Sequence, residues 1–406
     1  MACRSGCSCF FFFLFFFIVS LIHRFHAQTV SLPKTFLLPV TKDASSLQYL
    51  AKIRPGGDPP RPLTLVLDLG GPQLWTSHAP PTRLRVPLRS VECLSAANSG
   101  DERTRRGSTC VVISGNVVTG LAAPSELSEG AVTVESSHAA SIPAVHKLLF
   151  ALSPEYLLSG LASGASGMLG LGRARTALPN QLAAASGGDR RFFLCLSESD
   201  GVIAVGGDWP YFSSPSSGAD VSKSMVYAPL LTAEPGSSGE YSVKLRSIEV
   251  NGERLTLNSS SMQLSTVVPY TTMESSIYRA FTGAFAKAAA AMNITRAAVP
   301  AATPFELCFS AGSVRTTPTG PAVPEIDLVL QSEMVRWKVH GRNSMVRAND
   351  DVMCLGILNG GPEQKHGVVL GGHQLEDVLM EFDLGASVVG FSRSLLMSQT
   401  RCKDFS

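Results

Sequence analysis

One carboxylate in this chain is placed as a catalytic group would be. The apolar residues 63–67 end at Asp68, which is followed by Leu69 and Gly70. A carboxyl group at the end of a buried strand can act as a general acid or base when its surroundings shift its pKa. About 200 residues later, the segment 262–268 is a weak copy of this pattern and has Ser265 at the corresponding position. The second position therefore carries a hydroxyl in place of a carboxylate.

No other pattern in the sequence predicts chemistry. The chain has no Gly-x-Ser-x-Gly motif of a hydrolase nucleophile. The glycine-rich run 167–172 lacks the Lys and Ser/Thr of a phosphate-binding loop. No Cys or His spacing matches a zinc site. Several histidines are isolated, and most lone histidines are surface or core residues: His138, His146, His340, His366 and His373. We therefore expect no metal and no cofactor.

The elements that must position Asp68 are mainly β-strands. Short runs rich in β-branched and aromatic residues alternate with Gly, Pro and Ser, which is typical of strands and turns. These runs lie at 63–67, 110–113, 131–134, 201–205, 241–250, 326–330, 368–370 and 388–391. Helical patterns are few, the best being 275–292, with a short second one at 179–184. The sequence predicts an all-β protein with minor α content.

Two landmarks occur once in each half of the chain. The strand ends at Asp68 and Ser265 are each followed, about 100 residues later, by a glycine-rich strand end, at Gly170 and Gly371. This spacing predicts two similar lobes, residues 28–212 and 223–406, joined by a Ser-, Gly- and Pro-rich linker at 213–222. The alternative is a chance similarity among β-strands, which the spacing alone does not remove.

Residues 1–27 have the pattern of a secretory signal. Arg4 precedes an apolar run at 10–22, and a small residue, Ala27, ends the segment. The apolar run is too short to span a bilayer comfortably, although an uncleaved N-terminal anchor is the alternative. Basic and acidic residues are nearly balanced at 34 and 32, which argues against a nucleic-acid partner. We expect a secreted, extracellular monomer without a membrane span.

The cysteines agree with an oxidising compartment. Three of the nine lie within the predicted signal, and the other six are an even number, which suggests three disulfides. Six cysteines allow 15 pairings, and their spacing does not choose among them. Asn258 and Asn293 begin glycosylation sequons, which occur on the surface of secreted proteins.

A series of short motifs in fixed order resembles the plant members of the pepsin-like aspartic protease superfamily. The motifs are residues 68–70 with 74–75, 167–173 with 178–182, 192–196, 265–271, 305–309 and 390–392. Together they are similar to the group of plant xylanase inhibitors, extracellular dermal glycoprotein and basic 7S globulin, over roughly residues 29–406. The resemblance implies a two-lobed β fold with a central cleft. It also implies disulfides Cys195–Cys402 and Cys308–Cys354, which leaves Cys93 and Cys110 to each other.

Active members of the superfamily use two carboxylates that share one proton, each supplied by an Asp-Thr/Ser-Gly turn of one lobe. Here Leu69 replaces the hydroxyl residue of the first turn, and the second turn reads Ser265-Thr266-Val267. Ser265 could hydrogen-bond Asp68, but a hydroxyl cannot replace the second carboxylate. The resemblance thus implies an inactive cleft in which Asp68 is a vestigial, buried hydrogen-bond acceptor. The alternative, that Glu274 supplies the missing acid, requires a shifted register.

By resemblance, the expected function is inhibition of a microbial cell-wall glycosidase, especially an endo-β-1,4-xylanase, in plant defence. The wheat-type inhibitors insert a His near the C-terminus into the xylanase active site. The matching residues 393–401 contain no His. The candidates for target contact in this segment are Arg393, Leu396, Met397 and Arg401, of which the arginines could pair with glycosidase carboxylates. Two alternatives remain, an aspartic endopeptidase and a storage or peptide-binding protein like the globulins.

Overall fold

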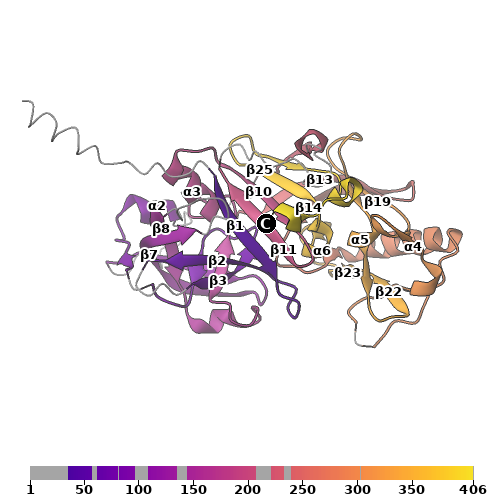
Figure 1. The fold of residues 1–406 in the computed structure, drawn as a ribbon, viewed down its shortest axis with the longest axis horizontal. Helices are drawn as coiled ribbons and strands as arrows, with labels where there is room; N and C mark the ends of the chain where they lie inside the picture. Colours follow the sequence, from indigo (N-terminus) through magenta and orange to yellow (C-terminus); the bar gives the residue numbers. More distant parts are fainter. Residues whose placement is uncertain are drawn as a thin grey trace, which may run out of the picture. The chain divides into compact units, whose positions relative to one another are not determined.

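The computed structural model of the chain (Figure 1) describes residues 35–56, 62–80, 82–96, 108–134, 144–206, 221–232, 239–301 and 303–405. The predicted signal at 1–27 and positions 213–220 of the predicted linker lie outside the described residues. None of the described helices is long and apolar enough to cross a membrane.

Strands dominate the first half of the described chain. Every strand predicted there from β-branched and aromatic runs is present, and so is the short helix that begins near Pro179. The elements are β1 (Phe36–Lys42), β2 (Tyr49–Pro55), β3 (Leu63–Asp68), β4 (Trp75–Thr76), β5 (Leu84–Arg85), α2 (Val91–Ala96), β6 (Val111–Asn116), β7 (Leu121–Val134), β8 (Ala144–Leu152), β9 (Gly167–Gly170), α3 (Leu178–Ser186), β10 (Arg191–Leu196) and β11 (Asp200–Val205).

The second half has the same character and includes the longest described helix, α4. Its elements are β12 (Val226–Pro229), β13 (Tyr241–Val250), β14 (Glu253–Leu264), β15 (Thr271–Met273), α4 (Ser275–Ala291), β16 (Cys308–Ser310), β17 (Thr316–Thr317), β18 (Gly320–Pro321), β19 (Ile326–Val329), β20 (Arg336–Val339), α5 (Gly341–Ser344), β21 (Met345–Arg347), β22 (Val352–Leu355), β23 (Ile357–Asn359), β24 (Val368–Leu370), α6 (Gly372–Leu375), β25 (Leu379–Asp383) and β26 (Val388–Phe391). Short 3₁₀ turns at Leu395–Ser398 and Cys402–Phe405 follow β26.

The two halves share one large sheet. Its strands run in the order β12-β26-β25-β10-β11-β1-β2-β3-β9-β4-β8-β7-β5, with β6 paired to β7. The three strands at one end of this order come from the second half, and β25 pairs antiparallel with β10 of the first. A separate sheet of seven strands, β20-β19-β13-β14-β24-β15-β23, belongs to the second half alone. The lobes are therefore joined by continuous strand pairing as well as by the chain.

The repeated landmarks occupy equivalent places in the two sheets. β3 pairs in parallel with β9, which sets Asp68 opposite Gly170. β14 pairs in parallel with β24 up to Leu264 and Leu370, one residue before Ser265 and Gly371. Both glycines are sterically required, because a Cβ would lie 2.4 Å from the Gln73 carbonyl oxygen at Gly170 and 2.5 Å from the Tyr270 carbonyl carbon at Gly371. The same strand pair thus carries the candidate residue in each half.

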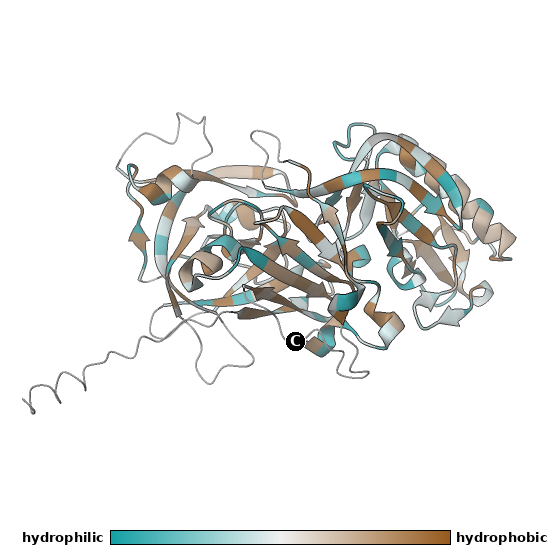
Figure 2. Cartoon of the chain, turned by 90° about the horizontal axis from the view of Figure 1, so that it is seen from above, coloured by the Kyte–Doolittle hydropathy of each residue, from teal (hydrophilic) through white to brown (hydrophobic). Residues whose placement is uncertain are grey.

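An aromatic cluster packs where the halves meet. Phe192 of β10 stacks on Phe382 of β25 at 4.7 Å between ring centroids, and Tyr241 of β13 packs against Phe382 at 4.6 Å. The Tyr241 hydroxyl donates a hydrogen bond to the Leu171 carbonyl at 2.9 Å. Hydrophobic residues alternate with polar ones along many strands (Figure 2), as expected of strands with one face in the core. This cluster anchors β13, which leads into the second-lobe sheet.

The structure contains the three disulfides that the resemblance implies. Cys93–Cys110 connects α2 to the residue before β6, and Cys308–Cys354 connects β16 to β22. Cys195–Cys402 connects β10 to the C-terminal 3₁₀ turn across 207 residues of sequence. The third disulfide fixes the C-terminus against the sheet that both halves share.

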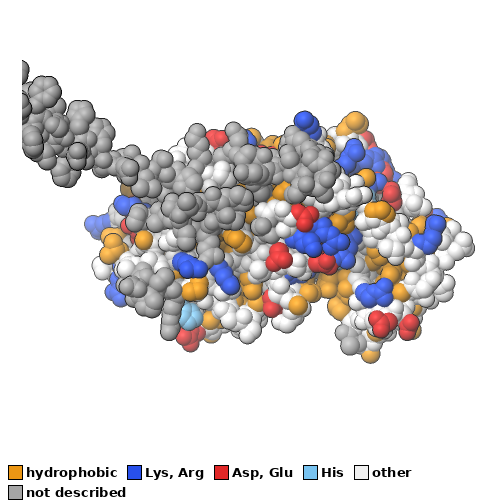
Figure 3. Space-filling view, viewed as in Figure 1, with side chains coloured by type: hydrophobic (Ala, Val, Ile, Leu, Met, Phe, Trp, Pro, Cys, Tyr) orange, Lys and Arg blue, Asp and Glu red, His pale blue; other side chains and the backbone are white. Residues whose placement is uncertain are grey.

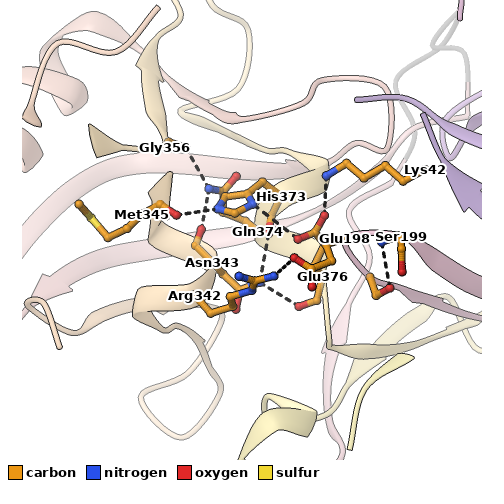
Figure 4. Close-up of polar contacts among 12 residues, drawn as sticks. Lys42, Glu198, Ser199, Arg342, Asn343, Met345, Gly356, His373, Gln374 and Glu376 are labelled. Atoms are coloured by element: carbon orange, nitrogen blue, oxygen red, sulfur yellow. Dashed lines mark hydrogen bonds and ion pairs between the residues drawn. The ribbon is translucent and has the colours of Figure 1, made fainter. Parts of the chain in front are cut away.

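A buried polar network around Glu376 also joins β1 to the second half (Figure 4). Lys42 Nζ lies 2.5 Å from Glu376 Oε1, and the Tyr49 hydroxyl donates to the same oxygen at 3.0 Å. His373 Nδ1 lies 3.6 Å from the other carboxylate oxygen, and Glu376 is 2% exposed. Burial raises the pKa of Glu376, but hydrogen bonding and charge from His373 and Lys42 outweigh it and lower the pKa to about 2. Glu376 is therefore held as a carboxylate.

Candidate functional site

Asp68 is held at the end of β3 by its own turn. Its side chain is 8% exposed, and Oδ1 accepts a hydrogen bond from the Gly70 amide at 3.1 Å. Its carbonyl accepts from the amides of Gly71 and Leu171. A Cβ on Gly71 would lie 2.8 Å from Asp68 Oδ2, so this turn needs a glycine there. The surrounding backbone therefore fixes the orientation of the carboxyl group.

Ser265 does not engage Asp68. Its Oγ accepts hydrogen bonds from the amides of Val267 at 3.3 Å and Val268 at 3.2 Å, and its amide donates to Leu370. No hydrogen bond joins Ser265 to Asp68 among the described residues, so the suggested contact between them is not formed. The Ser265 hydroxyl closes its own turn, much as Asp68 closes the turn of the first lobe.

Thr266 provides the direct link between the two turns. Its hydroxyl accepts a hydrogen bond from the Leu69 amide at 3.0 Å and donates one to the Leu67 carbonyl at 2.8 Å. Thr266 is 1% exposed, and the Leu69 side chain, fully buried, offers no hydroxyl in return. The side chain of Leu69 therefore makes no cross-lobe hydrogen bond, whereas its backbone amide and Thr266 do.

We expect Thr266→Val to lower the free energy of unfolding by about 1–3 kcal/mol. The substitution keeps the shape but leaves the buried Leu69 amide and Leu67 carbonyl without partners, and an unsatisfied buried group costs about that much. Urea denaturation would measure the change, with Thr266→Ser as the control that retains the hydroxyl. Equal stability of Thr266→Val and the unmodified protein would show that the cross-lobe pair contributes nothing.

A second carboxylate does lie near Asp68, from a residue the sequence analysis missed. A Cβ on Gly70 would lie 3.4 Å from Glu240 Cγ and 3.8 Å from Asp68 Oδ1, so Glu240 borders the Asp68 turn. Burial, and to a smaller extent the Glu240 charge, raise the pKa of Asp68 to about 6, against the lowering effect of the Gly70 and Gly71 amides. Glu240 also lies 3.6 Å from His366 Nε2, whose Nδ1 contacts Ser261 Oγ at 2.8 Å.

Glu274, the other candidate for a missing acid, has a structural role. It is the N-cap of α4, and its carboxylate accepts hydrogen bonds from the Ser276 and Ile277 amides. These hydrogen bonds and that of the Ser276 hydroxyl lower its pKa. Capping of α4 accounts for Glu274 at this position. The pairing of β14 with β24 ends directly before Ser265, as that of β3 with β9 ends at Asp68, so the register is not shifted towards Glu274.

The residues of the predicted target-binding segment behave differently from one another. Arg393 and Met397 are exposed, Met397 by 56%. Leu396 is only 7% exposed, because the 3₁₀ turn Leu395–Ser398 directs it into the core, so its proposed contact with a target is wrong. Arg401 pairs with Glu198 at 3.1 Å. Arg393 makes no ion pair among the described residues and is the cation of this segment that remains available.

Of the two predicted glycosylation sites, the structure describes the side chain of one. Asn293 is exposed at a left-handed turn after α4, with φ of 60°. The side chain of Asn258, on β14, lies outside what is described.

Comparison with known families assigns both halves of the chain. Residues 49–207 match the family model described as "Xylanase inhibitor N-terminal", and residues 240–393 match "Xylanase inhibitor C-terminal". The chain belongs to the xylanase-inhibitor family. Its fold is that of the pepsin-like aspartic proteinases, since the aspartic proteinase of Irpex lacteus superposes with a TM-score of 0.59 at 13% identity, over 90% of this chain and 99% of that one.

Relatives within the family match along nearly the whole chain. "Probable aspartic proteinase GIP2" of Nicotiana benthamiana is 38% identical, covering 93% of each chain. "Basic 7S globulin 2" of Glycine max is 32% identical, covering 97% of this chain and 95% of that one. The crystal structure of edgp superposes with a TM-score of 0.85 at 40% identity, over 92% of this chain and 98% of the other. The predicted family and fold are thus confirmed.

Proposed function

We propose that the chain is a secreted, proteolytically inactive family member that binds and inhibits a cell-wall-degrading glycosidase, with endo-β-1,4-xylanase as the first candidate. Ser265 carries this proposal. At the position of the second catalytic carboxylate it has a hydroxyl that is committed to its own turn. The two-carboxylate chemistry of the fold needs an acid and a base that share a proton, one from each of the two equivalent turns, and the second turn supplies no carboxylate. Glu240 borders the first turn instead and lies 3.6 Å from His366, so it does not take the place of the missing residue.

The proposed contact with the target is made by the C-terminal segment. Arg393 presents an exposed guanidinium without an ion pair among the described residues, and Met397 presents an exposed apolar side chain a few positions on. Glycosidases hold two carboxylates in their active site, and a guanidinium can bind such a group with charge-assisted hydrogen bonds. On the face in Figure 3, basic and acidic side chains are interspersed, so a local contact is favoured over a general electrostatic one.

Secretion and monomeric state belong to the same proposal. The predicted signal at residues 1–27 and the three disulfides support an extracellular location, such as the plant apoplast, where the protein would act in defence.

An inhibition assay tests the proposal. The purified protein is titrated against a panel of fungal and bacterial xylanases and related glucanases, and saturable loss of activity of at least one enzyme is expected. Arg393→Gln should weaken that inhibition by about 10-fold or more, because a charge-assisted hydrogen bond contributes roughly 1.5–3 kcal/mol. Arg401→Gln is the matched control, since Arg401 is already paired with Glu198. Full hydrolase activity across the panel would refute glycosidase inhibition.

The name of the Nicotiana relative makes proteolysis the second candidate. We expect no peptide hydrolysis at acidic pH, since removing one positioned acid or base costs about 10²–10⁴ in rate and groups that act as a unit cost more. Activity that a statine-type inhibitor blocks would instead assign an endopeptidase.

A further inference from the structure

A pocket of about 420 Å³ lies between β19, β20 and the segment that follows β26. Its volume is within the range of small-molecule sites, about 300–1,000 Å³, which are mainly apolar with a few convergent polar groups. The apolar part of the lining is Val226, Met334, Trp337, Val378, Phe391 and Met397. Trp337 and Phe391 pack together with 4.6 Å between ring centroids, and Met334 and Met397 are largely exposed.

The charges around this pocket are compensated except at one place. Lys338 pairs with Glu325 at 2.8 Å and approaches Asp327 at 3.5 Å, while Arg336 pairs with Glu249. Burial and the Lys338 charge lower the pKa of His340, so His340 adds no positive charge at neutral pH. Arg393, in contrast, lines the pocket without an ion pair among the described residues. The uncompensated charge at the pocket is therefore positive.

A buried hydroxyl beside Arg393 has no partner. Ser394 is 6% exposed, and its Oγ makes no hydrogen bond within the described part of the chain although it is shielded from solvent. Buried polar groups are normally satisfied, and an unsatisfied one needs an explanation such as a ligand that completes it. Because Ser394 lines the same pocket as Arg393, one ligand group could bind both.

We propose that this pocket binds a small aromatic carboxylate, with its carboxylate at Arg393 and Ser394 and its ring against Phe391 and Met397. The carboxylate would supply the acceptor that Ser394 Oγ lacks and the negative charge that Arg393 lacks. This site is separate from the Asp68 turn. It shares Arg393 and Met397 with the proposed glycosidase contact, so the two occupants would compete, but its test needs no hydrolase. Ser394, being buried, is not a residue that a docked protein surface would touch.

Saturation-transfer NMR and calorimetry with 3-phenylpropanoate test the site, with uncharged 3-phenylpropanamide as the matched probe. A ligand of this size should bind with a Kd on the order of 1 mM, and the amide should bind at least about 10-fold more weakly. Arg393→Gln should reduce binding of the acid to the level of the amide, whereas Arg401→Gln should leave it unchanged.

Ser394→Ala separates a ligand role from a structural one. Because an unsatisfied buried hydroxyl costs stability, removing it should leave the melting temperature equal or higher while weakening binding of the acid several-fold. A lower melting temperature with unchanged affinity would make Ser394 a structural residue and overturn its part in the site. No binding of the acid, or equal binding of acid and amide, would overturn the proposal as a whole.

Discussion

Glu376→Gln should lower the free energy of unfolding by about 3–5 kcal/mol at pH 7, the cost of removing one member of a buried ion pair. Glu376 is 2% exposed and accepts hydrogen bonds from Lys42 and Tyr49. The amide of Gln can replace at most part of these contacts, and the Lys42 ammonium, 11% exposed, would lose its counter-ion. Urea denaturation of the two proteins measures the difference.

The same pair predicts the acid limit of stability. The pKa of Glu376 falls from 4.5 to about 2 on folding, so its stabilising contribution is complete above pH 4.5 and is lost as the pH falls toward 2. A shift of this size corresponds to roughly 3 kcal/mol. The difference between the unmodified protein and Glu376→Gln should therefore shrink below about pH 4.

Glu198→Gln is the control for this experiment. Glu198 pairs with Arg342 and Arg401 in the same region (Figure 4), but its side chain is 51% exposed. Exposed ion pairs contribute about 0–1 kcal/mol, so little change is expected. If Glu376→Gln were no more destabilising than Glu198→Gln, the buried network would not hold the halves together.

Asp68→Asn should stabilise the protein by about 1–3 kcal/mol at pH 7 to 8. Burial raises the pKa of Asp68 from 3.8 to about 6, so the folded state loses stability relative to the unfolded chain as the pH rises from about 4 through 6. The neutral amide avoids this loss and can still accept from the Gly70 amide. Denaturation curves at pH 4 and pH 7.5 measure the effect, with the two proteins equally stable at the lower pH.

The variant also distinguishes a vestigial carboxylate from a working one. Hydrolase inhibition by Asp68→Asn should equal that of the unmodified protein, because the proposed contact uses Arg393. Destabilisation at pH 7.5 would contradict the argument and would mean that the amides of Gly70 and Gly71 stabilise an ionised Asp68 more than burial penalises it.

The sequence predicted those parts of the fold that local pattern specifies. Strands such as β13 alternate buried and exposed residues, and α4 carries its own apolar periodicity and cap. β1 was missed, because Pro39 and Lys42 weaken its strand pattern; its pairing with β11 and β2 stabilises it instead. The shared sheet depends on the pairing of β10 with β25, a long-range contact that no local pattern encodes.

In the candidate site too, the residues set by local pattern were predicted, and those set by tertiary packing were not. The landmark spacing placed Asp68 and Ser265 at equivalent strand ends, because residue type and glycine position determine the turn. Glu240 was missed because it borders Gly70 only through tertiary packing. The inward direction of Leu396 and the outward direction of Met397 come from the 3₁₀ turn after β26. The sequence predicted that this segment contacts a target, but it did not predict which of its side chains are buried and which are exposed.

The bond between Cys195 and Cys402 has a consequence for the protein after proteolytic processing. The two cysteines are 207 residues apart in the sequence, and the covalent ring that they close contains the junction of the two halves. One cut anywhere inside that ring would convert the chain into two polypeptides that remain joined by sulfur and by the β10–β25 pairing. Such a processed molecule would migrate as one species without reductant and as two with it, while retaining the fold.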